Sequence, residues 1–119
     1  PEERDDVGIL FTKLDQDASS DPKYIRMITR VARRMVKFGH KVLILCKELG
    51  NIKTIHEILT EKKIDTVCYY GSMKSHEDGS VIIATIKKGG VGYDIANRAK
   101  NYNGLPITCV ILTNSFVFG

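Results

Sequence analysis

Short, uninterrupted apolar runs alternate with segments of helical periodicity along this chain, and this alternation constrains its fold more than any other feature. Apolar runs such as KVLILC are typical of strands that are covered on both faces of a sheet. Alternating strands and helices favour a parallel sheet, so the sequence predicts an α/β domain with a mostly parallel sheet flanked by helices. The expected strands are Val7–Leu14, Lys41–Cys46, Asp65–Tyr70, Ser80–Thr85 and Ile107–Thr113.

Helices are expected between these strands. The first should begin at Pro22, where the missing N–H of proline costs nothing, and should end near Phe38. A second should begin near Asn51, and a short one is expected within 90–99. A length of 119 residues suits one domain with one core, so residues 1–119 are expected to form a single domain.

The connection between Tyr70 and Ser80 does not fit the pattern. Only nine residues, GSMKSHEDG, separate them, whereas a parallel crossover usually takes a dozen or more and contains a helix. Either this connection is unusually short, or residues are missing between 71 and 80.

Composition limits the classes of partner. The chain has 18 basic and 14 acidic side chains, and this mildly basic balance suits a polyanion without requiring one. No apolar run is long enough to span a membrane, so no membrane partner is expected. The spacing of Cys46, Cys68 and Cys109 fits no zinc motif. Three thiols expected in the core indicate a reducing, intracellular location, either cytoplasmic or nuclear.

The stretch SVIIATIKKGGVGYDI, residues 80–95, indicates a phosphate site, because two lysines and three glycines directly follow a buried strand. Ligands of parallel sheets bind beyond the carboxyl ends of the strands, and small, hydroxyl and basic residues there suit phosphates. The chain nevertheless lacks GxxxxGK[ST] and GxGxxG, and no Asp-Glu pair follows a predicted strand to hold Mg²⁺. We therefore expect no catalytic residue and no metal site in this chain.

Four segments together resemble the second, C-terminal RecA-like domain of superfamily 2 helicases and translocases, which has a P-loop NTPase-like fold. They are KVLILCK, VCYYGSMK, VIIATIKKGGVGYDIA and ITCVILTNS. The resemblance covers nearly the whole chain. Its specific part is motif V, on whose pattern Ala84, Thr85, Gly92 and Asp94 fall. Val91 departs from the pattern, because many members carry glutamate there.

The resemblance implies a role for each matching residue. Thr85 would bond a nucleic-acid phosphate, Gly71 and Ser72 would lie against the backbone of the bound strand, and Lys47 would approach another phosphate. Gly92 and Asp94 would face the ATP cleft. Outside the family pattern, we expect auxiliary phosphate contacts from two further residues, Lys87 and Lys88.

Structural roles are open for the same residues. Thr85 could cap the turn that follows its strand, and Asp94 could cap a helix or pair with Arg98 four residues on. Lys87 and Lys88 could be solvated charges. The same choice, between a solvated face and a surface for nucleic acid, applies to six cations of the first helix: Lys23, Arg26, Arg30, Arg33, Arg34 and Lys37.

The chain also lacks parts of the family pattern. Motif VI, QxxGRxxR, is expected after the last strand and does not occur, and motifs I and II belong to a first RecA-like domain. The resemblance thus implies a piece of a longer motor, truncated before motif VI and inactive alone. ATP and Mg²⁺ would act in the full-length protein. Its partners would be that first domain and nucleic acid, with DNA favoured over RNA.

Two other classes of function stay open. One is a Rossmann-like enzyme domain that binds a small nucleotide or cofactor, although the glycine fingerprint and a following acidic ribose partner are missing. The other is a non-catalytic regulatory domain that docks on a protein.

Overall fold

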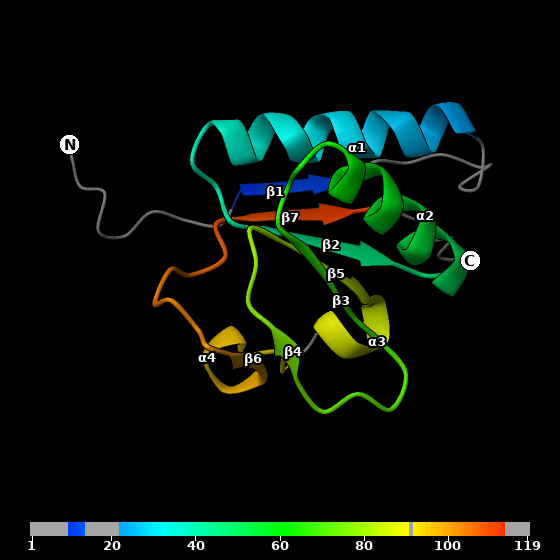
Figure 1. Cartoon of the computed structure of the whole chain (residues 1–119). Coiled ribbons are helices and arrows are strands. Elements are labelled where there is room, and N and C mark those ends of the chain that lie inside the picture. Colours follow the sequence, from blue (N-terminus) through cyan, green and yellow to red (C-terminus); the bar gives the residue numbers. More distant parts are fainter. Residues whose placement is uncertain (1–9, 14–21, 91, 114–119) are drawn as a thin grey trace.

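A parallel sheet of five strands forms the centre of the computed structural model, which describes residues 10–13, 22–90 and 92–113 (Figure 1). The strands lie in the order β1-β7-β2-β5-β3, and every neighbouring pair is parallel. The predicted α/β class with a mostly parallel sheet is therefore confirmed. The strand bounds are β1 (Leu10–Lys13), β2 (Val42–Cys46), β3 (Thr66–Tyr69), β5 (Val81–Thr85) and β7 (Cys109–Leu112).

Two long helices, α1 (Pro22–Lys37) and α2 (Leu49–Glu61), lie on one face of the sheet (Figure 1). Both carry apolar residues at helical spacing, and these pack on the strands in one cluster that includes Tyr24, Ile28 and Ile55. The first helix begins at Pro22 as predicted. It ends before Gly39, whose φ of +93° is a conformation that favours glycine after a helix.

Short elements cover the opposite face. They are β4 (His76–Glu77), α3 (Ile86–Gly89), α4 (Ile95–Arg98) and β6 (Ala99–Lys100), and β4 pairs with β6 in a parallel ladder. A second core cluster lies beneath them and joins Leu43, Tyr69 and Ile82 of the sheet to Ile95 of α4. This layer holds the residues that follow the carboxyl ends of β3 and β5.

The connection from β3 to β5 is short and has no helix. Residues 70–80 return across the sheet through β4, and β6 supplies the pairing partner that this segment needs. The amides of Ser80 and Val81 then donate to the carbonyl oxygen of Asp65 at 2.9 and 3.0 Å, which sets the start of β5. In the sequence as given, these contacts close the connection without a helix.

Other boundaries differ in detail from the predictions. The helix expected within 90–99 is confined to α4, and the turn after β5 contains α3, which the sequence did not predict. Of the predicted strand Val7–Leu14, residues 7–9 and 14 lie outside the described residues. None of the described helices is long and apolar enough to cross a membrane.

Candidate functional site

The sheet register brings three strand ends together. Cys46 of β2 lies opposite Thr85 of β5, and Tyr69 of β3 lies opposite Ala84. Because β5 lies between β2 and β3, the residues that follow these three strands meet at one edge. We call this the carboxyl edge.

A pocket lies at each end of the sheet, and the larger one, of about 770 Å³, is at the carboxyl edge. Five of the six residues predicted to contact nucleic acid line it, whereas Ser72 is exposed outside the lining. Three of the lining residues are lysines and none is acidic, so the pocket favours an anion. The lining consists of Lys47, Leu49, Tyr70, Gly71, Thr85, Lys87 and Lys88.

Thr85 caps the short helix that follows its strand. Its hydroxyl oxygen accepts a hydrogen bond from the backbone amide of Lys88 at 3.2 Å, so the structural role considered for Thr85 is present. A hydroxyl group has one hydrogen to donate besides the lone pairs that accept. The cap therefore leaves the Thr85 hydroxyl hydrogen able to donate to another acceptor.

The lysines of the pocket differ in their surroundings. The half-buried Lys88 donates from Nζ to the carbonyl oxygen of Met73 at 2.6 Å and lies 5.3 Å from the centre of the Tyr69 ring. It therefore joins α3 to the loop after β3, with two of its three hydrogens left to donate. Lys47 and Lys87 are exposed at the ends of neighbouring strands and bring positive charge to the rim of the pocket.

Glycines set the shape of this edge for two different reasons. A Cβ on Gly89 would lie 2.8 Å from both the Ala84 Cβ and Leu45 Cδ2, so α3 packs closely on the sheet only because this residue has no side chain. Gly71 has a φ of +62°, a backbone conformation that favours glycine. A Cβ added there would meet nothing within 4 Å, so the backbone conformation, and not a lack of space, explains glycine at this position. The close packing of α3 holds Lys87 and Lys88 over the end of β5.

The two residues expected at an ATP cleft lie outside this pocket, between α3 and α4. Gly92 has a φ of +82°. Asp94 caps α4, because its carboxylate accepts from the Ala96 amide at 3.1 Å and from the side-chain amide of Asn97 at 2.8 Å. The capping role considered for Asp94 is thus present, and its exposed carboxylate keeps further lone pairs for another donor.

An aromatic cluster beneath the carboxyl edge was not predicted. His76 Nδ1 lies 2.6 Å from the carbonyl oxygen of Glu77, which can only accept, so Nδ1 carries the hydrogen in the neutral ring. Nε2 then accepts from the Tyr93 hydroxyl at 2.6 Å, and burial raises the pKa of Tyr93. Tyr69 packs against both rings. No local pattern marks this cluster, because its members are far apart in sequence and His76 belongs to the unpredicted β4.

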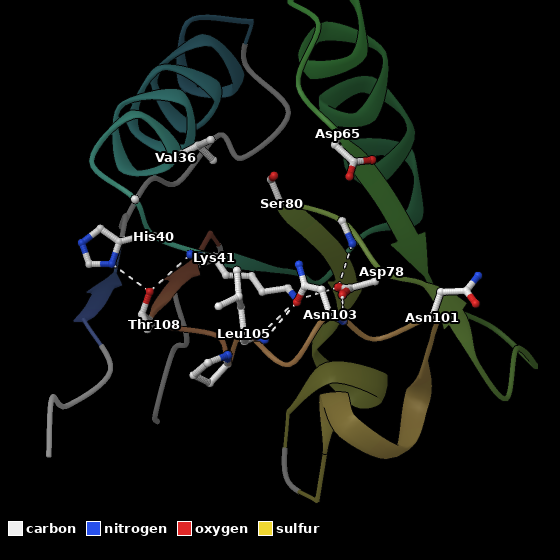
Figure 2. A pocket seen from close by; sticks show the side chains of 13 residues that line it. Val36, His40, Lys41, Asp65, Asp78, Ser80, Asn101, Asn103, Leu105 and Thr108 are labelled. Atoms are coloured by element: carbon white, nitrogen blue, oxygen red, sulfur yellow. Dashed lines mark hydrogen bonds and ion pairs between the residues drawn. The ribbon is translucent and has the colours of Figure 1, made fainter. Parts of the chain in front are cut away.

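The pocket at the opposite edge, about 490 Å³, is built around a buried ion pair (Figure 2). Lys41 Nζ lies 2.6 Å from Asp78 Oδ1 and also donates to Asn103 Oδ1 at 3.1 Å and to the carbonyl oxygen of Leu105 at 3.0 Å. The three hydrogens of the ammonium group thus have three acceptors. This edge, which we call the amino edge, has its lysine charge neutralised within the fold.

Burial opposes ionisation of Asp78, but its hydrogen bonds with Lys41, Asn103 and Gly79 outweigh that effect and hold its pKa below the ordinary value. Nothing in the sequence marks this network beyond Lys41 at the start of an apolar run. Its members come from the residue before β2, from the β3–β5 connection and from the loop before β7. The network therefore fastens the short elements to the sheet.

The cysteines behave as core residues. Burial raises the pKa of the Cys46 thiol to about 11 and also raises the pKa values of Cys68 and Cys109. None of the three forms a disulfide. Within 10–13, 22–90 and 92–113, no group of three or more histidine, cysteine or acidic residues could hold a metal ion.

Searches with the chain against protein-family models, curated proteins and solved structures found no match. The pocket at the carboxyl edge and the motif pattern of the sequence are therefore the two guides to function.

Proposed function

We propose that this domain binds the phosphate backbone of nucleic acid at the carboxyl edge of its sheet, as the second RecA-like domain of an ATP-dependent superfamily 2 helicase or translocase. One observation carries the proposal. The strand that resembles motif IV and the strand that resembles motif V are hydrogen-bonded neighbours, with Cys46 opposite Thr85, so Lys47, Thr85 and Lys87 share one pocket.

The chemistry of the pocket favours a phosphate over an uncharged ligand. Three lysines, a threonine hydroxyl and the backbone at Gly71 surround it, and the lining has no carboxylate to repel an anion. Contacts to phosphates carry no sequence information, which suits a motor that moves along any sequence. DNA is the favoured polymer in this proposal.

ATP and Mg²⁺ would act between this domain and a first RecA-like domain in the full-length protein. Gly92 and Asp94 would form part of one wall of that cleft, where the exposed Asp94 carboxylate could accept from a ribose hydroxyl or from an arginine. The isolated chain is expected to have no ATPase activity, because it lacks phosphate-loop, Mg²⁺-binding and motif VI residues. An ATPase rate that persists through purification would contradict this part of the proposal.

The Rossmann-like alternative has less support. A dinucleotide site needs a glycine fingerprint after the first strand and an acidic residue that hydrogen-bonds the ribose. The carboxyl-edge lining has no acidic residue, and the sequence has no such fingerprint. Tight, saturable binding of a free dinucleotide would favour this alternative over the motor domain.

Salt-dependent binding to labelled single- and double-stranded DNA tests the proposal. Each lysine that contacts a phosphate adds about 0.9 to the slope of log affinity against log salt for duplex, and about 0.7 for single strands. Lys47→Ala and Lys87→Ala should each lower the slope by about that amount. Lys100→Ala, which removes an exposed lysine from the β4–β6 layer, should leave it unchanged.

Two further variants separate the hydroxyl from the cap. Thr85→Ser keeps both the acceptor for the Lys88 amide and the donor for phosphate, so it should bind like the wild type. Thr85→Ala loses both. The proposal fails if Lys47→Ala, Lys87→Ala and Lys100→Ala all have the slope of the wild type.

A further inference from the structure

The exposed side of α1 carries a row of cations that the proposed function does not use. Every cation of the helix is exposed, and the sixteen residues of α1 include no acidic residue. The spacing of three and four places them along one side of the helix. At about 1.5 Å per residue the row is about 20 Å long. It consists of Lys23, Arg26, Arg30, Arg33, Arg34 and Lys37.

The row continues into a hollow beside the end of α2. A pocket of about 440 Å³ is lined by five cations and two apolar residues, with no carboxylate. Four of these cations belong to α1 and the fifth, Lys62, follows α2. Among the described residues, no hydrogen bond or ion pair engages the side chains of Arg30, Arg33, Arg34, Lys37 or Lys62.

This arrangement is unfavourable for the helix itself. Like charges at i and i+4, such as Arg30 with Arg34, repel each other. Salt-bridged surface helices normally alternate charges of opposite sign, and α1 does not. An extended polyanion would relieve the repulsion along the whole row at once.

Geometry and residue type favour nucleic acid as that polyanion. A row of about 20 Å is longer than one phosphate group and comparable with several phosphates of a strand, which follow one another about every 3.4 Å of duplex axis. Four of the six cations are arginines, whose planar guanidinium groups bind phosphate with two hydrogen bonds.

A membrane surface fits less well. A basic helix that binds lipid inserts its apolar face among the acyl chains. The apolar face of α1, including Tyr24, Ile25 and Ile28, is buried against the sheet and is not available for insertion.

We infer that the outer face of α1, together with Lys62, is a second surface for the sugar-phosphate backbone of nucleic acid. It is separate from the carboxyl-edge pocket and shares no residue with it. The inference therefore goes beyond the proposed function and is independent of it.

The test removes two cations from the row and measures duplex DNA binding by the 119-residue chain as a function of salt. Arg30→Gln combined with Arg34→Gln should lower the slope of log affinity against log salt by about 1.8, which is two phosphate contacts. The matched control is Arg98→Gln combined with Lys100→Gln. This pair removes the same charge from exposed residues on the opposite side of the sheet and should leave the slope within error of the wild type.

Thermal unfolding of both double variants shows whether the fold is kept. Because Arg30 and Arg34 have no partners among the described residues, their replacement should not lower Tm. A wild-type slope in the Arg30→Gln/Arg34→Gln variant would overturn the inference, whatever the carboxyl-edge lysine variants do. If Lys47→Ala and Lys87→Ala keep the wild-type slope while Arg30→Gln/Arg34→Gln lowers it, the proposed function is overturned and the inference about α1 is supported.

Two other polyanions test whether this face prefers nucleic acid. Phosphatidylserine vesicles and poly-glutamate carry negative charge without a nucleic-acid backbone. Each should bind more weakly than duplex DNA at equal salt. If either binds as tightly as the duplex, with the same loss in Arg30→Gln/Arg34→Gln, then nucleic acid is not the specific partner of this face.

Discussion

The two edges of the sheet both present lysine, yet their lysines do different things. At the amino edge Lys41 is 6% exposed and its ammonium group has three acceptors within the fold. At the carboxyl edge Lys87 is exposed, in a pocket lined by no carboxylate. A lysine beside a pocket therefore indicates a ligand only when the fold does not already neutralise its charge.

Lys88 lies between these two cases. It lines the carboxyl-edge pocket but donates to the Met73 carbonyl and lies over the Tyr69 ring. Its replacement would change both the charge of the pocket and the position of α3. Replacing the exposed Lys87 therefore tests binding at α3 with less effect on the structure.

The largest effect is expected from Lys41→Ala. Removing one partner of a buried ion pair costs about 3 to 5 kcal/mol of unfolding free energy, and here, among the described residues, it leaves the Asp78 carboxylate with only the backbone amides of Asn103 and Gly79 as donors. Urea denaturation measures this loss. Lys87→Ala, which replaces an exposed lysine at the other edge, should change stability by less than about 0.5 kcal/mol. Equal losses in the two variants would remove the distinction between the edges.

The next effect concerns Gly89. A methyl group there would lie 2.8 Å from Ala84 Cβ and Leu45 Cδ2, so Gly89→Ala should cost about 1 to 3 kcal/mol through overpacking. The control is Gly50→Ala in α2, where nothing lies within 4 Å of the added carbon. It should stabilise the fold by roughly 0.4 to 1 kcal/mol. Chemical denaturation of both variants decides whether α3 is held by close packing.

A smaller loss of stability is expected from removing the helix cap at the carboxyl edge. Thr85→Ala removes the acceptor for the Lys88 amide and should cost about 1 kcal/mol. Thr85→Ser keeps the acceptor and should cost less than Thr85→Ala. If thermal unfolding shows the same Tm for both variants, the Thr85 hydroxyl does not stabilise this turn.

The smallest effect is expected from acid. The pKa of Asp78 is lowered in the fold, so its contribution to stability is complete above the ordinary aspartate value of about 4 and is lost as the pH falls through the lowered value. Asp78→Asn removes this titration. The difference in unfolding free energy between wild type and Asp78→Asn should shrink as pH falls from about 5 to 2. A constant difference over that range would contradict the network at the amino edge.

Much of the sheet could be predicted because its strands have a local signature. KVLILC and SVIIAT are continuous apolar runs, and they became the adjacent strands β2 and β5. Placing ligands beyond strand ends then brought Lys47, Thr85 and Lys87 into one group without knowledge of the strand order. The structure places these three residues in one pocket.

The covering layer could not be predicted in the same way. The strands β4 and β6 have two residues each, too few for any periodicity, and each exists only because the other pairs with it. The network of Lys41 with Asp78 and Asn103 depends on that layer, as does the contact of His76 with Tyr93. Such contacts join residues far apart in sequence, and no local pattern marks them.

The most direct test of the contrast between the edges is an NMR titration of the labelled chain with a short single-stranded DNA. Backbone amide shifts should change at Lys47, Gly71, Thr85 and Lys87, and the amides of Lys41, Asp78 and Asn103 should stay unchanged. Additional changes along α1 would report on the second surface. Shift changes centred on the Lys41–Asp78 pocket, with none at the carboxyl edge, would contradict a nucleic-acid site at the carboxyl edge.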